Sequence, residues 1–114
     1  MKHNEMLEHI ERIFNKVIKM HTEGQKEYAM DEDNVFANFE RIAEQTGFDK
    51  KMVLWIYLMK HIDGIASYLK GHKSQREDVT GRLTDAIVYL CILWAMISKR
   101  DRSEYTTHYF PKGD

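Results

Sequence analysis

The strongest chemical pattern in the sequence lies near the start of the last predicted helix. Asp78, Arg82, Asp85 and Tyr89 follow one another at i, i+4, i+7 and i+11, a spacing that places them on one side of a helix. Asp85 directly precedes an apolar run, and an ionised carboxylate beside a core needs a partner such as Arg82 or a metal. The pattern therefore indicates either a structural ion pair or a site for a metal or a phosphate.

A second polar stripe lies in the preceding apolar segment. Lys60, Asp63 and Ser67 occur there at i, i+3 and i+7, so they share one side of a predicted helix. One interpretation is an exposed face with a weak Lys60 to Asp63 ion pair. In the other interpretation, Asp63 binds a divalent metal through oxygen and Lys60 meets a phosphate as a point charge.

His61 belongs to the apolar side of that segment, because it aligns with Leu54, Leu58 and Ile65. We expect its imidazole to be at least partly buried. It is either a hydrogen-bonded core histidine, or a general acid or base or a donor to a ligand, since histidine titrates near neutral pH. The six histidines do not form a His-Glu-x-x-His pattern and Cys91 is the single cysteine, which argues against a structural zinc site.

Further candidates lie upstream. Glu40 and Glu44 are four residues apart, and they either face one cation together or are solvated glutamates. Asn38 offers an amide for recognition of a base, between two phenylalanines that are first explained as core residues. Lys26 and Tyr28 suit phosphate and stacking contacts from the flank, although such residues also serve as ordinary polar surface.

Composition excludes several classes of function. The chain has 114 residues and a formal net charge of -1, from 17 Lys plus Arg against 18 Asp plus Glu. We expect one domain with no global field for nucleic acid. A single cysteine cannot form an internal disulfide, and no apolar run follows the first residues, so we expect a cytoplasmic protein. The longest apolar stretch, residues 86–97, is shorter than the roughly 20 residues of a membrane span, so we expect no membrane association.

The elements that must position these residues are predicted to be helices. Helix-forming residues recur at helical spacing between residues 4 and 99, and the one proline is Pro111, which together favour an all-α class. We expect a first amphipathic helix that stops near Gly24 and a loop over residues 25–34. A second helix then ends at Thr46 and Gly47, and Asp49 caps the next one.

The second half of the chain predicts two longer helices. The third spans about residues 50–69 and is closed by Gly71, and a polar loop over residues 72–78 follows. The fourth is apolar on nearly all sides from Ala86 onward, which implies burial by other helices or by a second subunit. We therefore expect a four-helix, bundle-like single domain that is able to dimerise, with a core at about 4–99 and a C-terminal arm at 100–114.

Four segments in this order resemble a known group of proteins. They are Glu-Tyr-Ala, Asp-Asn-Val-Phe-Ala-Asn-Phe, Lys-His-Ile-Asp and Gly-Arg-Leu-Thr-Asp-Ala-Ile-Val-Tyr-Leu. Over residues 26–97 the chain resembles a nucleotide-modification-associated helical family of bacteriophages and bacteria, itself similar to the MazG-like all-α nucleoside triphosphate pyrophosphohydrolases. The resemblance implies a helical bundle, often dimeric, that handles nucleotides through Mg²⁺ held by acidic residues of two helices.

Carried over residue by residue, Asp85 matches the last acid of the Glu-x-x-Asp motif, while Arg82 stands where that motif has its glutamate. Glu77 takes the place of the missing acid from one turn earlier. The resulting hypothesis assigns Mg²⁺ to Glu40, Asp63, Glu77 and Asp85, the nucleotide to Tyr28, Asn38, Lys60 and Arg82, and catalysis to His61 and Asp85.

Two activities follow from this hypothesis. The first is pyrophosphate release from a nucleoside triphosphate, with a homo-oligomer as the working form. The alternative is a non-catalytic phage accessory or counter-defence protein that sequesters a nucleotide signal or binds a host protein, and Arg82 in place of an acid favours it. A third, purely structural oligomer would need no ligand.

Overall fold

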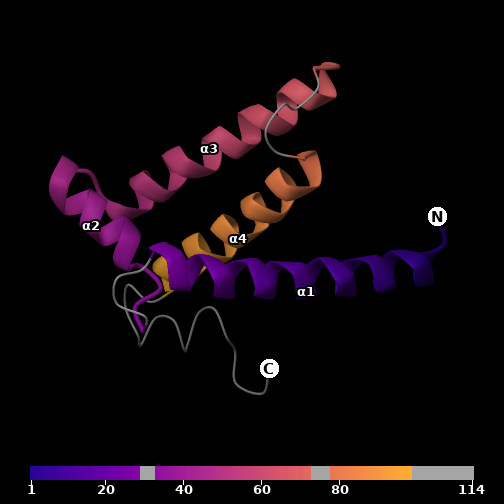
Figure 1. Cartoon of the computed structure of the whole chain (residues 1–114), viewed down its shortest axis with the longest axis horizontal. Coiled ribbons are helices and arrows are strands. Elements are labelled where there is room, and N and C mark those ends of the chain that lie inside the picture. Colours follow the sequence, from indigo (N-terminus) through magenta and orange to yellow (C-terminus); the bar gives the residue numbers. More distant parts are fainter. Residues whose placement is uncertain (29–32, 73–77, 99–114) are drawn as a thin grey trace.

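Four α-helices form the part of the computed structural model that is described, residues 1–28, 33–72 and 78–98 (Figure 1). No strand occurs among these residues, so the predicted all-α class is confirmed. The helices pack against one another as a single helical domain, and the predicted C-terminal arm and Glu77 lie outside the described residues. The helices are α1 (His3–Tyr28), α2 (Ala37–Thr46), α3 (Lys50–Leu69) and α4 (Val79–Ser98).

Most helix ends lie where the sequence predicts them. Gly47 takes the left-handed conformation at φ 81° and donates its N–H to the Ala43 carbonyl, which ends α2. The Asp49 carboxylate accepts the Lys51 N–H at 2.7 Å and caps α3. Gly71, at φ 97°, follows the end of α3. These short-range signals therefore predict the α2–α3 half of the fold.

One predicted boundary is wrong, because α1 does not stop near Gly24 but continues to Tyr28. A glycine inside a helix costs about 1 kcal/mol, and favourable helix formers follow it, including Lys26 and Glu27. The longer helix also gains an anchor, since Gln25 Nε2 donates to the Asn34 carbonyl at 3.2 Å. As a result, Tyr28 belongs to a helix and not to the predicted loop.

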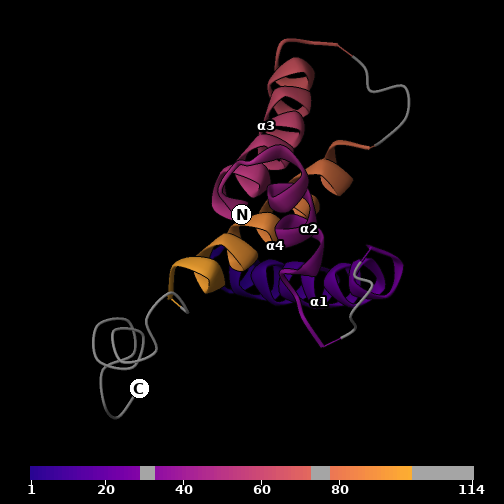
Figure 2. The ribbon, with the colours of Figure 1, turned by 90° about the vertical axis from the view of Figure 1, so that its left-hand side faces the viewer.

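The core lies where α2, α3 and α4 meet. Its fully buried members are Phe39, Val53, Leu54 and Met96, and α4 is packed between α3 on one side and α1 on the other (Figure 2). Only the C-terminal half of α1 takes part, since Val17 is its one buried residue among those described and residues 1–12 are all exposed. The N-terminal half of α1 extends beyond the other helices (Figure 1).

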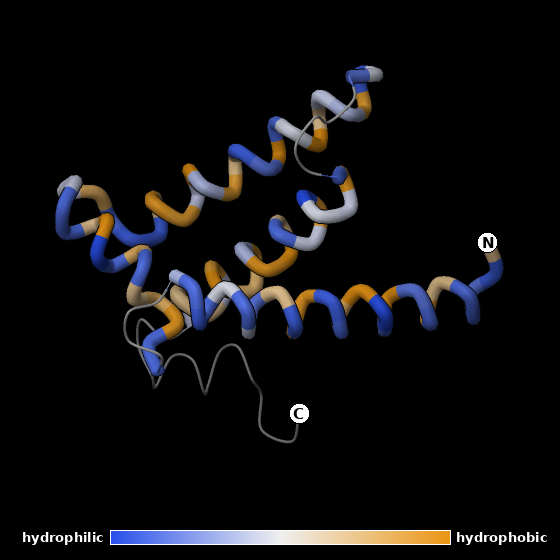
Figure 3. Tube along the Cα trace, in the orientation of Figure 1, coloured by the Kyte–Doolittle hydropathy of each residue, from blue (hydrophilic) through white to orange (hydrophobic). Residues whose placement is uncertain are grey.

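The prediction that other helices of the chain bury α4 on most sides is correct for only part of its surface. Its surfaces toward α3 and α1 are covered, but Leu90, Trp94 and Ile97 are 49%, 64% and 43% exposed. By length and composition alone α4 is apolar enough to cross a membrane, although core helices of soluble proteins meet the same criterion. Apolar residues also recur along α3 and along α1 (Figure 3). The helices of this chain therefore leave part of their apolar surface uncovered.

Candidate functional site

A cavity of about 510 Å³ gathers residues from all four helices. This volume is in the range of pockets that bind small molecules, about 300–1,000 Å³. Five of the residues predicted for the site line it together: Tyr28 of α1, Asn38 of α2, Lys60 and His61 of α3, and Asp85 of α4. Its complete lining among the described residues is Tyr28, Asn38, Tyr57, Lys60, His61, Asp85 and Tyr89.

A buried histidine and a carboxylate face each other at the centre of this lining. His61 is 5% exposed, and its Nδ1 lies 3.6 Å from Asp85 Oδ2. That distance is longer than a hydrogen bond but short enough for strong electrostatic attraction when the imidazole is protonated. Both groups also line the cavity, so they are able to interact with a bound molecule as well as with each other.

Aromatic rings form the wall beside this pair. Tyr89 lies 5.6 Å from the His61 ring, centroid to centroid, at an interplanar angle of 32°. It also lies 6.1 Å from Phe39 and 6.5 Å from Tyr57 in edge-to-face arrangements. Such ring pairs add about 0.5–1.5 kcal/mol each beyond the burial of their area. The packed aromatic wall therefore holds His61 in position from one side.

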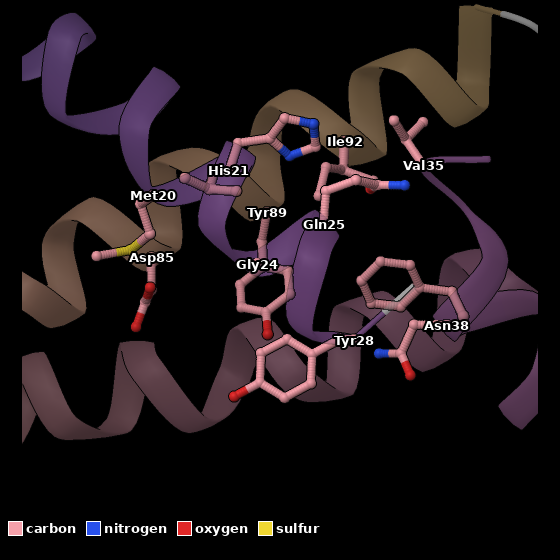
Figure 4. Close-up of a pocket in the computed structure, with 12 residues that line it drawn as sticks. Met20, His21, Gly24, Gln25, Tyr28, Val35, Asn38, Asp85, Tyr89 and Ile92 are labelled. Atoms are coloured by element: carbon pink, nitrogen blue, oxygen red, sulfur yellow. The ribbon is translucent and has the colours of Figure 1, made fainter. Parts of the chain in front are cut away.

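A smaller cavity of about 140 Å³ adjoins the first, and the two share Tyr28, Asn38, Asp85 and Tyr89. In Figure 4 the Asp85 carboxylate and the hydroxyl groups of Tyr28 and Tyr89 point toward the same side of this space. The far end is lined by α1 and by apolar side chains such as Ile92. The site thus combines a polar mouth with a more apolar interior.

The ionisation of Tyr28 is shifted by its neighbours. The charge of the neighbouring Glu27 carboxylate raises the pKa of the Tyr28 phenol, a hydrogen bond to Glu27 and slight burial raise it further, and the Asp85 charge adds to the effect. At neutral pH the phenol is therefore a hydroxyl that can donate a hydrogen bond to a ligand.

The two predicted phosphate-binding cations are placed differently. Lys60 is exposed at the mouth of the cavity. Arg82 lies outside the lining, with its side chain against Gly64, so that a Cβ atom at Gly64 would be only 2.5 Å from the Arg82 Cδ and Nε atoms. Arg82 is one turn from Asp85 on α4, and Gly64 is one turn from His61 on α3. The Arg82 side chain thus lies at the contact, or seam, between α3 and α4, one helical turn from the pair of His61 and Asp85.

Glu40 lies outside the cavity lining. It accepts a hydrogen bond from Asn34 Nδ2 at 2.8 Å and forms an ion pair with Lys50 at 3.1 Å. The hydrogen bond from Asn34 is the main cause that lowers the pKa of Glu40, and Lys50 lowers it further. Glu40 therefore fastens the segment before α2 to the start of α3.

The other predicted metal ligands do not join Asp85 among the described residues. Asp63 on α3 and Glu44 on α2 are both exposed, and neither lines the cavity. Within residues 1–28, 33–72 and 78–98, no three Asp, Glu, His or Cys side chains lie close enough to hold a metal together. Asp85 alone suits Mg²⁺ that arrives with a nucleotide, because Mg²⁺ often uses one carboxylate together with substrate phosphates and waters.

Two tyrosines of the cavity have no role in the predicted site, although Tyr89 belongs to the polar pattern at the start of the last helix. Tyr57 precedes His61 by four residues, and Tyr89 follows Asp85 by four residues. Residues four apart share one side of a helix, so each tyrosine lies on the same face as a residue that the prediction selected. The same spacing already places Tyr89 beside Asp85 in the sequence pattern, and for Tyr57 it is the signal that the prediction did not use.

Comparison of the chain with protein-family models, with curated proteins and with solved structures found no match in any of the three.

Proposed function

We propose that this protein binds a nucleotide in the cavity between its four helices. The observation that carries the proposal is the combination of aromatic rings, an amide, a cation and an acid on one lining of suitable volume. A nucleotide makes use of the first three: a flat surface for the base, hydrogen-bonding groups for its edge, and positive charge for its phosphates. A solvent-filled gap between helices needs none of them.

Each residue has a role in this proposal. The rings of Tyr28 and Tyr89 offer a stacking surface for the base. The Asn38 amide is able to donate to and accept from the edge of a base. Lys60, exposed at the mouth, meets a phosphate as a mobile point charge. With Arg82 on the adjoining seam, the phosphates are expected at the side of the cavity formed by α3 and α4.

The same geometry suits hydrolysis of a nucleoside triphosphate. His61, held beside Asp85, is able to take a proton from a water molecule as that water attacks the α-phosphorus. The new P–O bond forms as the bond to the bridging oxygen breaks, so that a nucleoside monophosphate and pyrophosphate leave. When bound with the triphosphate, Mg²⁺ would neutralise the charge that develops on the phosphate oxygens.

A second candidate is binding without hydrolysis, which the placement of the acids favours. Asp85 is the one carboxylate on the described lining, and His61 Nδ1 lies 3.6 Å from its Oδ2. Phosphate binding by Lys60 and Arg82 needs no metal. In this form the protein would sequester a nucleotide signal, and binding would survive removal of Mg²⁺.

Isothermal titration calorimetry with nucleoside mono-, di- and triphosphates, each in Mg²⁺ and in EDTA, tests the proposal. We expect a dissociation constant in the micromolar range that Lys60→Ala weakens about tenfold, corresponding to about 1.4 kcal/mol. The matched control is Lys70→Ala, because Lys70 is exposed at the end of the same helix and outside the cavity.

The outcomes separate the two candidates. Mg²⁺-dependent binding with pyrophosphate release supports hydrolysis, whereas equal affinity in EDTA without product supports sequestration. No heat of binding with any nucleotide, or equal losses in the Lys60 and Lys70 variants, would refute a nucleotide site in this cavity. A host protein would then be the partner to seek.

A further inference from the structure

A separate cavity of about 440 Å³ lies between α1 and α4 and is lined mostly by apolar side chains. Its volume falls in the range of small-molecule pockets, about 300–1,000 Å³. It shares no lining residue with the cavity of about 510 Å³ that we propose for a nucleotide. We call it the apolar cavity, and its described lining is Phe14, Val17, Ile18, His21 and Thr22 of α1, Val35, and Val88, Cys91, Ile92 and Ala95 of α4.

Helical spacing explains how the two helices form the apolar cavity. Its α4 members lie at i, i+3, i+4 and i+7, and its α1 members lie at i, i+3, i+4, i+7 and i+8, so each set forms one side of its helix. Val17 and Val88 are 7% and 9% exposed and form the floor, whereas Phe14 and Ile18, at 53% and 64%, form an open rim. A ligand in the cavity would therefore cover apolar surface that the chain leaves in contact with water.

The shape of the apolar cavity favours a narrow molecule over a helix of another protein. Thr22 follows Phe14 by eight residues, which corresponds to about 12 Å along α1. A volume of about 440 Å³ spread over this length gives a mean width of about 7 Å. A helix with its side chains is about 10–12 Å wide. A hydrocarbon body fits, since an apolar cavity of about 150 Å³ is already enough to bind benzene.

One end of the apolar cavity is polar and has balanced charges. An adjoining cavity of about 340 Å³ shares His21 and Thr22 with it and is otherwise lined by Gln25, Lys26 and Asp33. Lys26 and Asp33 contribute opposite charges, so this end offers hydrogen-bond donors and acceptors without favouring an anion or a cation. A molecule that suits both parts has an apolar chain and an uncharged head that donates and accepts hydrogen bonds.

We propose that the apolar cavity binds a neutral amphiphile, with its hydrocarbon chain between α1 and α4 and an uncharged hydroxyl or amide head beside Lys26. A C–C bond is about 1.5 Å long and an extended chain advances about 1.3 Å per carbon, so a length of about 12 Å accommodates about nine carbons. This site is separate from the proposed nucleotide site and does not depend on it.

Cys91 makes binding directly measurable, because it is the single cysteine of the chain, is exposed and lines the apolar cavity. The experiment measures the rate at which N-ethylmaleimide modifies Cys91 in the full chain, titrated with 1-alkanols from butanol to dodecanol. A bound chain covers the thiol, so we expect modification to be about tenfold slower at saturation. Affinity should rise about fourfold for each added CH₂ group, from about 0.8 kcal/mol per buried group, and should level off near nine carbons.

Two variants locate the bound chain, with 1-octanol affinity measured by calorimetry. Ala95→Phe places a ring in the apolar cavity and is expected to weaken binding about tenfold, corresponding to about 1.4 kcal/mol. Ala66→Phe is the matched control, because Ala66 is also partly buried but lies on α3, outside the apolar cavity. Ile18→Gln alters only the exposed rim, so it keeps the fold, and it should weaken binding about threefold.

Several results would overturn the proposal. They are unchanged Cys91 modification with every alkanol, affinity that still rises from decanol to dodecanol, equal effects of Ala95→Phe and Ala66→Phe, and tighter binding of octanoate than of 1-octanol. Slow modification that depends on protein concentration and not on alkanol would show that a second copy fills the cavity instead. Nucleotide binding without alkanol binding would refute this site alone, whereas alkanol binding without nucleotide binding would support it and refute only the proposed function.

Discussion

His61 and Asp85 belong to different helices, yet each determines what the other can do. The imidazole is 5% exposed. If His61 were protonated, the Asp85 carboxylate 3.6 Å away would compensate its charge, and removal of that carboxylate would leave a buried cation uncompensated. Conversely, an ionised Asp85 at the edge of the core is favoured by a cation beside it. A phosphate entering the cavity would meet the Asp85 carboxylate and the His61 imidazole together. The pair is therefore the point at which ligand charge is expected to have its largest effect.

Asp85→Asn removes one charge while keeping the shape of the side chain. We expect the variant to lose Mg²⁺-dependent binding but to bind a nucleoside triphosphate about fivefold more tightly in EDTA, because a carboxylate in the cavity repels phosphate. Fivefold corresponds to about 1 kcal/mol. Calorimetry of wild type and variant, each in Mg²⁺ and in EDTA, measures the change. Asp63→Asn is the control, since Asp63 is exposed and outside the cavity, and equal effects in the two variants would contradict the placement of the ligand.

Glu40 predicts a pH dependence of stability. The Asn34 hydrogen bond and then Lys50 lower the pKa of Glu40 in the folded protein, so its contribution is fully present above the unfolded pKa of about 4.3 and is lost as the pH falls through the folded value. The Glu40 side chain is 42% exposed, which limits the contribution to below about 1 kcal/mol. Glu40→Gln should therefore lower the melting temperature at pH 7 and converge with wild type once the pH has fallen below the folded pKa of Glu40. A constant difference across this range would show that the charge is not the cause.

At the scale of elements, the seam between α3 and α4 depends on the small size of Gly64. Arg82 occupies the space where a Cβ atom at position 64 would lie. The end of an arginine side chain moves easily, so Gly64→Ala is expected to displace the guanidinium and to keep the fold. Alanine also favours the helix by up to about 1 kcal/mol relative to glycine.

Gly64→Ala is accordingly predicted to leave the melting temperature unchanged or to raise it, while nucleotide affinity falls about as far as it does in Arg82→Gln. The double variant should bind no more weakly than either single variant, because both remove the same contribution. Additive losses in calorimetry would mean that Arg82 does not act from the position beside Gly64.

The elements also show how far the sequence predicts the structure. Gly47 and Asp49 place the ends of α2 and α3 correctly, because capping acts between residues close in the chain. The predicted end of α1 is wrong because the hydrogen bond from Gln25 to Asn34 joins residues nine apart and leaves no short-range pattern in the sequence. The cavity gathers Tyr28, Asn38, Lys60, His61 and Asp85 as one site, whereas Glu40 has a separate structural bond. Side-chain type and helical phase predict which residues are available, but the packing of helices decides which of them meet.

For the whole molecule, α1 is the element with the least support from the rest of the chain. Its C-terminal half packs on α4 and contributes Tyr28 to the cavity, whereas residues 1–12 bury no side chain against the described core. Isolated helical turns are marginally stable in water, even in favourable sequences. The free energy needed to open α1 locally should therefore be low in its N-terminal half and higher in its C-terminal half, which contributes Tyr28 to the cavity.

Hydrogen exchange of the backbone amides measures this difference. Amides of residues 5–12 are predicted to exchange by local opening, at least tenfold faster than those of residues 17–26. Val17→Ala, at a position 7% exposed, should cost about 1–2 kcal/mol from the two lost methyl groups and should accelerate exchange in the second half. Ile10→Ala, at a position 37% exposed, should leave that half unchanged. Slow exchange throughout residues 5–12 would contradict the free N-terminal half and would show that its apolar residues are covered in solution.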